Sequence, residues 1–162
     1  MSIFLKNEQA TLEFGQLLAE HLDSGMNIYL HGDLGAGKTT LVRGLVQYFL
    51  PSAKVKSPTY TLVEDYELAD TVKNNSIQHI HHFDLYRLSD PEELEYLGGR
   101  DYFSAEALCL VEWPERGVGW LPEADVEITL KYQTDGRNVI VESHSKKGKT
   151  LLNALNTYQE TS

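Results

Sequence analysis

The segment from Gly32 to Thr39, with the sequence GDLGAGKT, constrains this chain more than any other part of it. It fits the pattern G-x-x-x-x-G-K-[ST], in which the glycines let successive backbone N–H groups turn toward a bound phosphate. A short apolar run at 26–30 precedes it, and residues 40–49 have the apolar spacing of a helix, which Pro51 ends. Because a phosphate-binding loop requires a strand before it and a helix after it, we predict that nucleotide phosphates bind here.

The residues of this loop have distinct expected roles. Lys38 is predicted to bridge the β- and γ-phosphates, Thr39 to offer its hydroxyl to Mg²⁺, and Thr40 to donate to the α-phosphate. We expect Lys38 to face solvent as a phosphate ligand and not to belong to the core. The other nucleotide contacts are assigned to Asp33, Leu34, Gly35, Ala36 and Gly37.

Two carboxylates are candidates for the metal, because Mg²⁺ prefers hard oxygen ligands. Glu112 follows the apolar run 107–111, and Asp84 ends another β-rich stretch. Either side chain fits a role in holding the metal or in positioning a water molecule. The residues alone leave open which of the two is the direct ligand.

The rest of the chain predicts a mixed α/β sheet with helices packed on it. Helices are expected at 8–22 and 150–158, with a short one that starts at Asp90 and ends before Gly98. Strands are expected at 60–66, 77–86 and 107–111, and a hairpin at 126–132 and 138–142. No repeat or long linker interrupts the 162 residues, which indicates a single domain over 1–162.

The charge balance argues against direct binding to nucleic acid. Fourteen basic residues stand against 24 acidic ones, a net charge of −10, which repels phosphate backbones and anionic membrane surfaces. Only 131–150 is basic, and its residues Lys146, Lys147 and Lys149 are interpreted as a solvated turn before the last helix.

The chain also lacks the features of an exported or membrane protein. It has no apolar run of the roughly 18 residues that a membrane span needs, and its start does not have the order of a signal peptide. The single cysteine, Cys109, cannot form an internal disulfide. We therefore expect a cytoplasmic protein without membrane contact.

Aromatic and histidine residues near the strand ends admit two interpretations. Trp113 and Tyr86 are candidates to stack on adenine, although aromatic residues at such places more often belong to the core. His79, His81 and His82 alternate on a strand as metal ligands can, but a zinc site needs three or four ligands with orienting partners. We favour the interpretation without metal for the histidines.

Four blocks in order resemble the bacterial TsaE (YjeE) ATPases, which help to make threonylcarbamoyladenosine in tRNA. The first block is the loop continued to Thr40, the second is 57–62 (SPTYTL), the third is 82–87 (HFDLYR) and the fourth is 111–116 (VEWPER). The likeness covers residues 8–125, and the hairpin and last helix follow by length and pattern.

This resemblance implies a P-loop NTPase-like three-layer fold with a mixed, mainly parallel sheet and a C-terminal β-hairpin. It also implies ATP and Mg²⁺ as cofactors and weak ATPase activity, required for modification of adenosine 37 in tRNAs through regulation of the TsaB and TsaD proteins. By resemblance, Thr59 lies in a nucleotide-responsive loop, and Asp84 and Glu112 serve the metal and water, with Glu112 favoured as the ligand.

Two other functions remain open. A small-molecule kinase would need an acceptor site and an arginine-rich lid, whereas the loops here are short and acidic. A nucleotide-binding module without turnover would use ATP only to stabilise a surface, and the two carboxylates argue against it.

Overall fold

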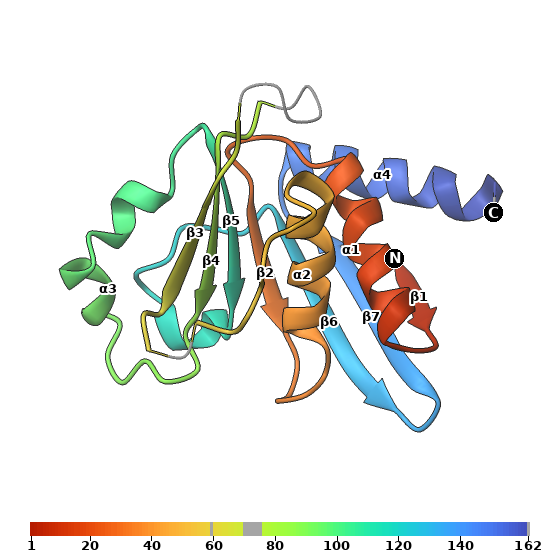
Figure 1. Ribbon diagram of the computed structural model, residues 1–162, viewed down its shortest axis with the longest axis horizontal. Helices are drawn as coiled ribbons and strands as arrows, with labels where there is room; N and C mark the ends of the chain where they lie inside the picture. Colours follow the sequence, from red (N-terminus) through yellow and green to blue (C-terminus); the bar gives the residue numbers. More distant parts are fainter. Residues whose placement is uncertain (59, 70–75, 162) are drawn as a thin grey trace.

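The computed structural model describes residues 1–58, 60–69 and 76–161 (Figure 1). The elements of this part follow the chain in the order β1 (Ser2–Leu5), α1 (Glu8–Glu20), β2 (Asn27–His31), α2 (Lys38–Phe49), β3 (Val63–Glu67), β4 (His79–Asp84), α3 (Glu93–Tyr96), η1 (Gly99–Tyr102), β5 (Ala107–Glu112), η2 (Pro114–Gly117), β6 (Val126–Gln133), β7 (Gly136–Ser143) and α4 (Lys146–Thr161).

One mixed sheet contains all these strands, in the order β1-β7-β6-β2-β5-β4-β3. The four central strands, β6, β2, β5 and β4, run parallel to one another. The outer pairs are antiparallel, including the hairpin of β6 and β7. The predicted α/β class, the mixed sheet and the C-terminal hairpin are therefore confirmed.

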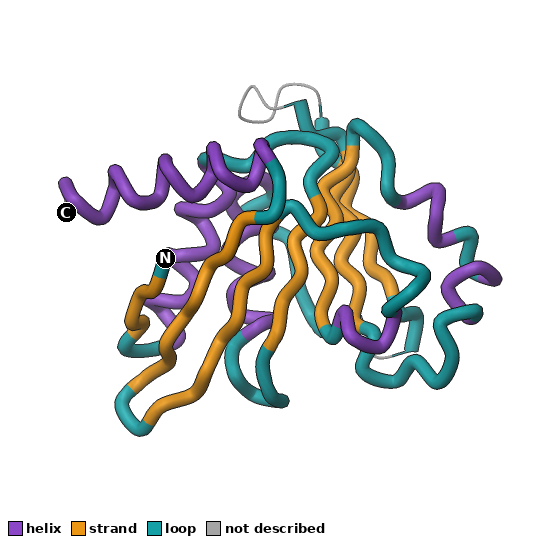
Figure 2. The backbone as a smooth tube through the Cα atoms, turned by 180° about the vertical axis from the view of Figure 1, so that it is seen from behind, coloured by secondary structure: helices purple, strands orange, loops and turns teal. Residues whose placement is uncertain are grey.

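The two faces of the sheet are covered differently. Helices α1 and α2 lie over one face, where their apolar sides, with α4, pack on the sheet in a core that includes Phe14, Leu18, Leu45, Leu151 and Leu155 (Figure 1). Short elements cover β2, β4 and β5 on the other face, through a second apolar cluster around Phe83, Leu94 and Cys109. In the part of the chain that the structure describes, no helix crosses β6 and β7 on that second face, as the view from behind shows (Figure 2). The second outer layer therefore consists of short helices and loops.

Local sequence explains most element boundaries. The Asn7 side chain accepts a hydrogen bond of 2.8 Å from the backbone N–H of Ala10 and so caps the start of α1. All six residues of β5 are buried, as a continuous apolar run between two parallel neighbours predicts. The expected helix after Asp90 is one turn only, and the Asp90 carboxylate accepts a hydrogen bond from the backbone N–H of Glu92.

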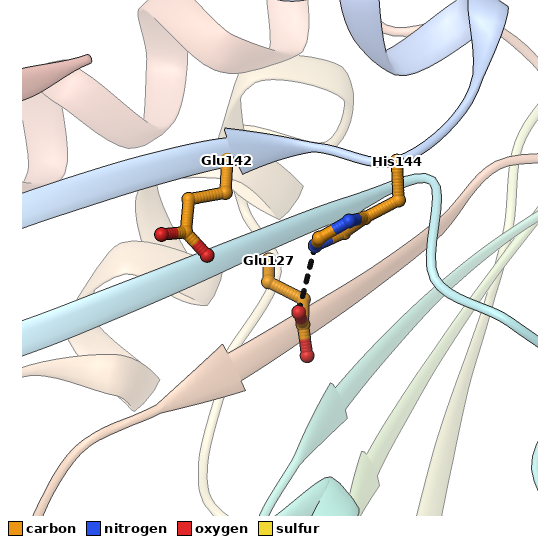
Figure 3. A group of neighbouring side chains, drawn as sticks. All are labelled: Glu127, Glu142 and His144. Carbon is orange, nitrogen blue, oxygen red and sulfur yellow. Dashed lines mark ion pairs between the residues drawn. The ribbon is translucent and has the colours of Figure 1, made fainter.

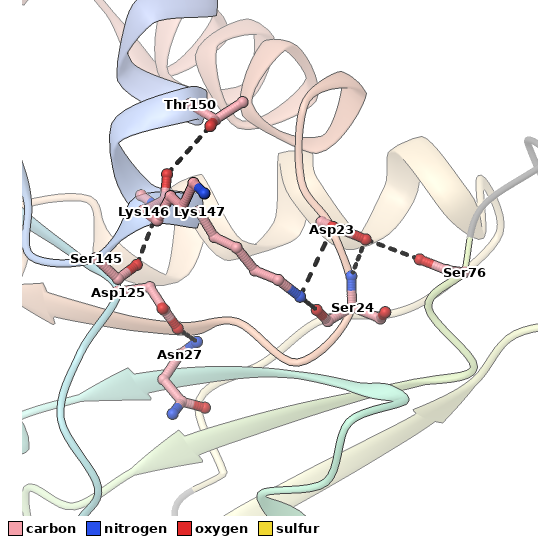
Figure 4. A network of polar contacts seen from close by, with 10 residues as sticks. Asp23, Ser24, Asn27, Ser76, Asp125, Ser145, Lys146, Lys147 and Thr150 are labelled. Atoms are coloured by element: carbon pink, nitrogen blue, oxygen red, sulfur yellow. Dashed lines mark hydrogen bonds and ion pairs between the residues drawn. The ribbon is translucent and has the colours of Figure 1, made fainter.

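Two expectations about the chain's ends were wrong or incomplete. The sequence patterns did not predict β1, which pairs with β7 at the edge of the sheet. Lys146, Lys147 and Lys149 do not form a turn before the last helix, because α4 already begins at Lys146. Ser145 caps this helix by accepting from the N–H of Gly148, and the Lys147 ammonium bonds to the carbonyl oxygen of Ser24 at 2.6 Å (Figure 4).

Gly148 explains how closely α4 packs on the neighbouring segment of the chain. A Cβ atom at this position would lie 2.1 Å from the carbonyl oxygen of Asp125, so only glycine lets α4 approach the residue before β6 so closely. No helix of the described residues has the length and apolar character to cross a membrane.

Candidate functional site

The predicted phosphate-binding loop lies between β2 and α2, at the carboxyl end of the central strands. Gly37 directly precedes α2 with a φ of 108°, a left-handed conformation that favours glycine. A cleft of about 300 Å³ opens at this point, and its lining includes the predicted residues Asp33, Leu34, Gly35, Ala36, Gly37, Lys38, Thr39, Thr40, Asp84, Glu112 and Trp113. Residues from three separate parts of the sequence therefore meet in one cleft.

Lys38 is placed differently from the expectation. Its exposed fraction is only 5%, so it does not face solvent, and its ammonium donates to the carbonyl oxygens of Gly32 and of Asp33, the latter at 3.2 Å. Burial lowers the pKa of Lys38, while the Glu112 and Asp84 carboxylates act in the opposite direction. The expectation failed because backbone carbonyls of the loop itself offer the ammonium partners inside the cleft.

Glu112 is the centre of a chain of polar contacts. It is the last residue of β5, is 2% exposed, and accepts from Nε2 of the buried His82 at 2.5 Å. Both of its carboxylate oxygens lie 3.3 Å from the Thr39 hydroxyl, which is also 2.8 Å from the Ser57 hydroxyl. Thus the predicted metal pair, Thr39 and Glu112, is in direct contact.

Asp84 lies beside Glu112 because the two residues are partners in the parallel register of β4 and β5. Its carboxylate accepts a hydrogen bond of 3.1 Å from the N–H of Tyr86. Burial raises the pKa of Asp84, and the nearby Glu112 charge adds to the rise. Two carboxylates thus lie at the ends of neighbouring strands. Of these two, Glu112 forms a hydrogen bond with Thr39 in the described chain, and Asp84 does not.

Trp113 lines the cleft beside Lys38. It follows β5 in a left-handed conformation with a φ of 57°, and the Lys38 ammonium lies 4.2 Å from the centre of its ring. The Trp113 ring also contacts the ring of Tyr86, with ring centres 5.0 Å apart. Stacking of Trp113 on adenine stays a prediction.

The predicted role of Thr59 falls on a residue outside the described part of the chain. Sequence reasoning also missed several residues that line the cleft or contact its lining residues. Ser57 was noted only as part of a block, and His82 was weighed as a metal ligand but not as the partner of Glu112. Glu8 and Arg137 line the cleft as well, and the Arg137 guanidinium donates to the Thr11 hydroxyl at 3.0 Å. The β6–β7 hairpin brings Arg137 to the cleft, so no local sequence motif indicates its position.

Comparison with known proteins places the chain in one family. The family model described as "Threonylcarbamoyl adenosine biosynthesis protein TsaE" matches residues 5–139. The "tRNA threonylcarbamoyladenosine biosynthesis protein TsaE" of Haemophilus influenzae is 46% identical over 156 residues, which cover 93% of this chain and 94% of that protein. The protein of the same name from Bacillus subtilis is 34% identical over 134 residues, 83% of this chain and 79% of its own.

The fold has a solved counterpart. A crystal structure described as that of Bacillus subtilus YdiB superposes with a TM-score of 0.77 and covers 98% of this chain and 95% of its own, at 24% sequence identity. At this identity the structural match supports the fold alone, whereas the family follows from the sequence matches. The chain therefore belongs to the TsaE family, as the four sequence blocks predicted.

Proposed function

We propose that this protein is a Mg²⁺-dependent ATPase that acts in the threonylcarbamoyl modification of adenosine 37 in tRNAs, in the cytoplasm. The observation that carries the proposal is the contact between the Thr39 hydroxyl, at the start of α2, and the buried Glu112 carboxylate, at the end of β5. The pathway comes from the names of the relatives.

The loop and α2 supply the means to hold phosphate. The first N–H groups of a helix have no partners within it, and the helix dipole adds partial positive charge at the same end. Lys38 lies in the cleft with its ammonium on two backbone carbonyls. In the proposed complex it exchanges these partners for the β- and γ-phosphate oxygens, which as anions accept stronger hydrogen bonds than carbonyls.

The oxygen atoms of Thr39 and Glu112 fit a magnesium ion. Neighbouring ligands in an octahedral Mg²⁺ site, each 2.0–2.1 Å from the ion, are about 3 Å apart. The observed separation between the Thr39 hydroxyl and the Glu112 oxygens is 3.3 Å. A bound Mg²⁺ would supply neutralisation of the charge that develops on the phosphates.

His82 and Asp84 complete the arrangement. The His82 hydrogen bond fixes one oxygen of Glu112 and so holds the carboxylate toward Thr39. Asp84 has only the Tyr86 N–H as a hydrogen-bond donor in the described chain, which leaves acceptor capacity to orient an attacking water. We assign Thr59 to the same water-positioning function by resemblance alone.

We further propose that the TsaB and TsaD proteins regulate this ATPase. Large apolar side chains are exposed near the cleft, with Leu34 65% and Tyr60 90% exposed, and they offer area to a protein partner. A second hollow of about 310 Å³, lined by Leu34, Ser57 and Asp84 among others, adjoins the nucleotide residues. A partner seated there would contact Leu34 and Ser57 beside the nucleotide residues and raise the low turnover that we propose for the isolated protein.

The test is a steady-state ATPase assay of the protein alone, with tRNA, with a TsaB–TsaD complex, and with both. We expect the partner complex to raise turnover and tRNA alone to leave it unchanged, because a chain of net charge −10 repels a polyanion. Stimulation by tRNA without the proteins would overturn the proposed regulation.

A further inference from the structure

A group of histidine and glutamate side chains lies on the second face of the sheet, outside the nucleotide cleft. We call His31, Glu127, Glu142 and His144 the His–Glu cluster. Glu127 belongs to β6, Glu142 to β7, and His144 follows β7 directly. One ligand atom from each of these three residues lies within 4.8 Å of the others, and Figure 3 shows the side chains converging.

The register of the hairpin forces two like charges together. Glu127 and Glu142 are directly opposite each other on antiparallel strands, where carboxylates repel. Among the described residues, the ion-pair partners of Glu127 are two histidines, His31 Nε2 at 2.8 Å and His144 Nε2 at 2.7 Å. Within the described residues, neither glutamate pairs with a lysine or arginine, and Glu142 has no ion pair. A cation between the two carboxylates would remove the repulsion.

We propose that the His–Glu cluster binds a divalent transition-metal ion of the zinc type, through His144 Nε2 and one carboxylate oxygen each of Glu127 and Glu142. Imidazole nitrogen with carboxylate oxygen is a donor set that suits Zn²⁺ and its neighbours, whereas Mg²⁺ and Ca²⁺ prefer oxygen alone. Three protein ligands leave a position for water, and an adjoining hollow of about 400 Å³, lined in part by Tyr29, Glu127 and His144, gives it room.

His31 is a positioning residue of this site. It holds Oε1 of Glu127, while His144 contacts Oε2, so the carboxylate is fixed from both sides. Because a carboxylate only accepts, His144 Nε2 carries a proton in the observed contact. On metal binding this proton leaves Nε2, to solvent from an imidazolium or by a shift to Nδ1 from the neutral tautomer, and the nitrogen lone pair binds the ion.

The site is independent of the proposed ATPase function. No member of the His–Glu cluster lines the nucleotide cleft. The two sites also differ in chemistry, since the candidate metal ligands at Thr39 and Glu112 are oxygen atoms. Substitutions that remove metal binding at the His–Glu cluster therefore leave nucleotide binding in the cleft to be tested separately, and the reverse also holds.

The test is equilibrium dialysis of the full chain against Zn²⁺, in excess Mg²⁺ so that the oxygen-ligand site is filled. We expect one Zn²⁺ per chain. Glu142→Gln and His144→Asn should each weaken binding about 100-fold, and His31→Asn about tenfold. His21→Asn, an exposed histidine at the end of α1, and Glu112→Gln serve as controls that retain binding.

The substitutions in the cluster lie at partly or fully exposed positions, and circular dichroism with thermal unfolding checks that each variant is folded. A second readout is the visible absorption of Co²⁺, which should appear on binding and disappear when Zn²⁺ replaces it. Absence of a stoichiometric ion in the parent protein would overturn the proposal. Equal affinity in the parent, Glu142→Gln and His144→Asn would do so as well.

Discussion

Lys38→Met separates the role of the Lys38 charge from the role of its bulk. The parent side chain is 5% exposed, and its ammonium contacts two backbone carbonyls and the Trp113 ring. Methionine keeps an apolar stem of similar length beside Trp113 but removes the charge. We expect stability to be nearly unchanged and nucleotide affinity to fall strongly.

The magnitudes follow from the contacts. Loss of two hydrogen bonds from a charged donor costs about 1.5–3 kcal/mol each, while removal of a buried ammonium relieves a desolvation penalty of about several kcal/mol. These terms nearly cancel, so the free energy of unfolding should change by about 1 kcal/mol or less. In the nucleotide complex, the two proposed phosphate contacts replace two carbonyl contacts, and a net loss of about 2–3 kcal/mol corresponds to roughly 30- to 140-fold weaker binding.

Isothermal calorimetry with MgATP measures the affinity, and urea unfolding measures the stability. Lys54→Met is the matched control, because Lys54 is exposed and does not line the cleft. The reasoning is refuted if Lys38→Met and Lys54→Met bind MgATP with the same affinity. A Lys38→Met protein that unfolds several kcal/mol more easily would show instead that the carbonyl contacts of Lys38 are structural.

Three further predictions concern single residues of the cleft. Trp113→Phe should abolish the change in tryptophan emission on nucleotide binding, because movement of the Lys38 ammonium alters the surroundings of Trp113; a persistent response would assign the signal to Trp120. Gly37→Ala should lower the free energy of unfolding by about 1–2 kcal/mol, because alanine is strained in the left-handed backbone conformation, and Cβ would also crowd Arg137 Nε at 3.2 Å. Gly35→Ala is the control in urea unfolding, because Gly35 has a φ of 78° but no described atom lies within 4 Å of the added Cβ, so this variant measures the backbone strain alone. Asp84→Asn should stabilise the protein at neutral pH, because folding raises the pKa of Asp84 and so disfavours its ionised form in the folded protein. The gain in the free energy of unfolding should shrink as the pH falls through the raised pKa toward the ordinary value of 3.8, and vanish below it. Urea unfolding at several pH values measures this gain, and a gain that is constant with pH would contradict the proposed cause.

Features encoded in contiguous residues were predictable from the sequence. The loop, its flanking strand and helix, and the buried strand β5 follow from patterns within a few residues of one another. The convergence of Asp84 and Glu112 also followed, because carboxyl ends of parallel strands meet at one edge. The hairpin of β6 and β7 was also predictable, because its two strands and the turn between them are contiguous in the sequence.

The remaining features depend on contacts between distant residues. Strand β1 has only four residues, and its pairing partner Ile140 lies far along the chain from Ser2. The packing of α4 depends on the close approach of Gly148 to Asp125, which a run of lysines does not suggest. Arg137 reaches the cleft, and the buried His82 reaches Glu112, through packing of separate elements, so neither contact was visible in the motifs.

Release of γ-labelled phosphate from ATP, with Glu112→Gln measured in parallel, tests most directly whether this cleft hydrolyses ATP. The assay contains the protein, Mg²⁺ and a TsaB–TsaD complex, and the partner complex alone gives the background. We predict free inorganic phosphate that depends on Mg²⁺ and is lost in Glu112→Gln, since the carboxylate beside the Thr39 hydroxyl is the proposed metal ligand. Phosphate release that is equal in the parent and Glu112→Gln, or label transferred to another molecule instead of water, would contradict it.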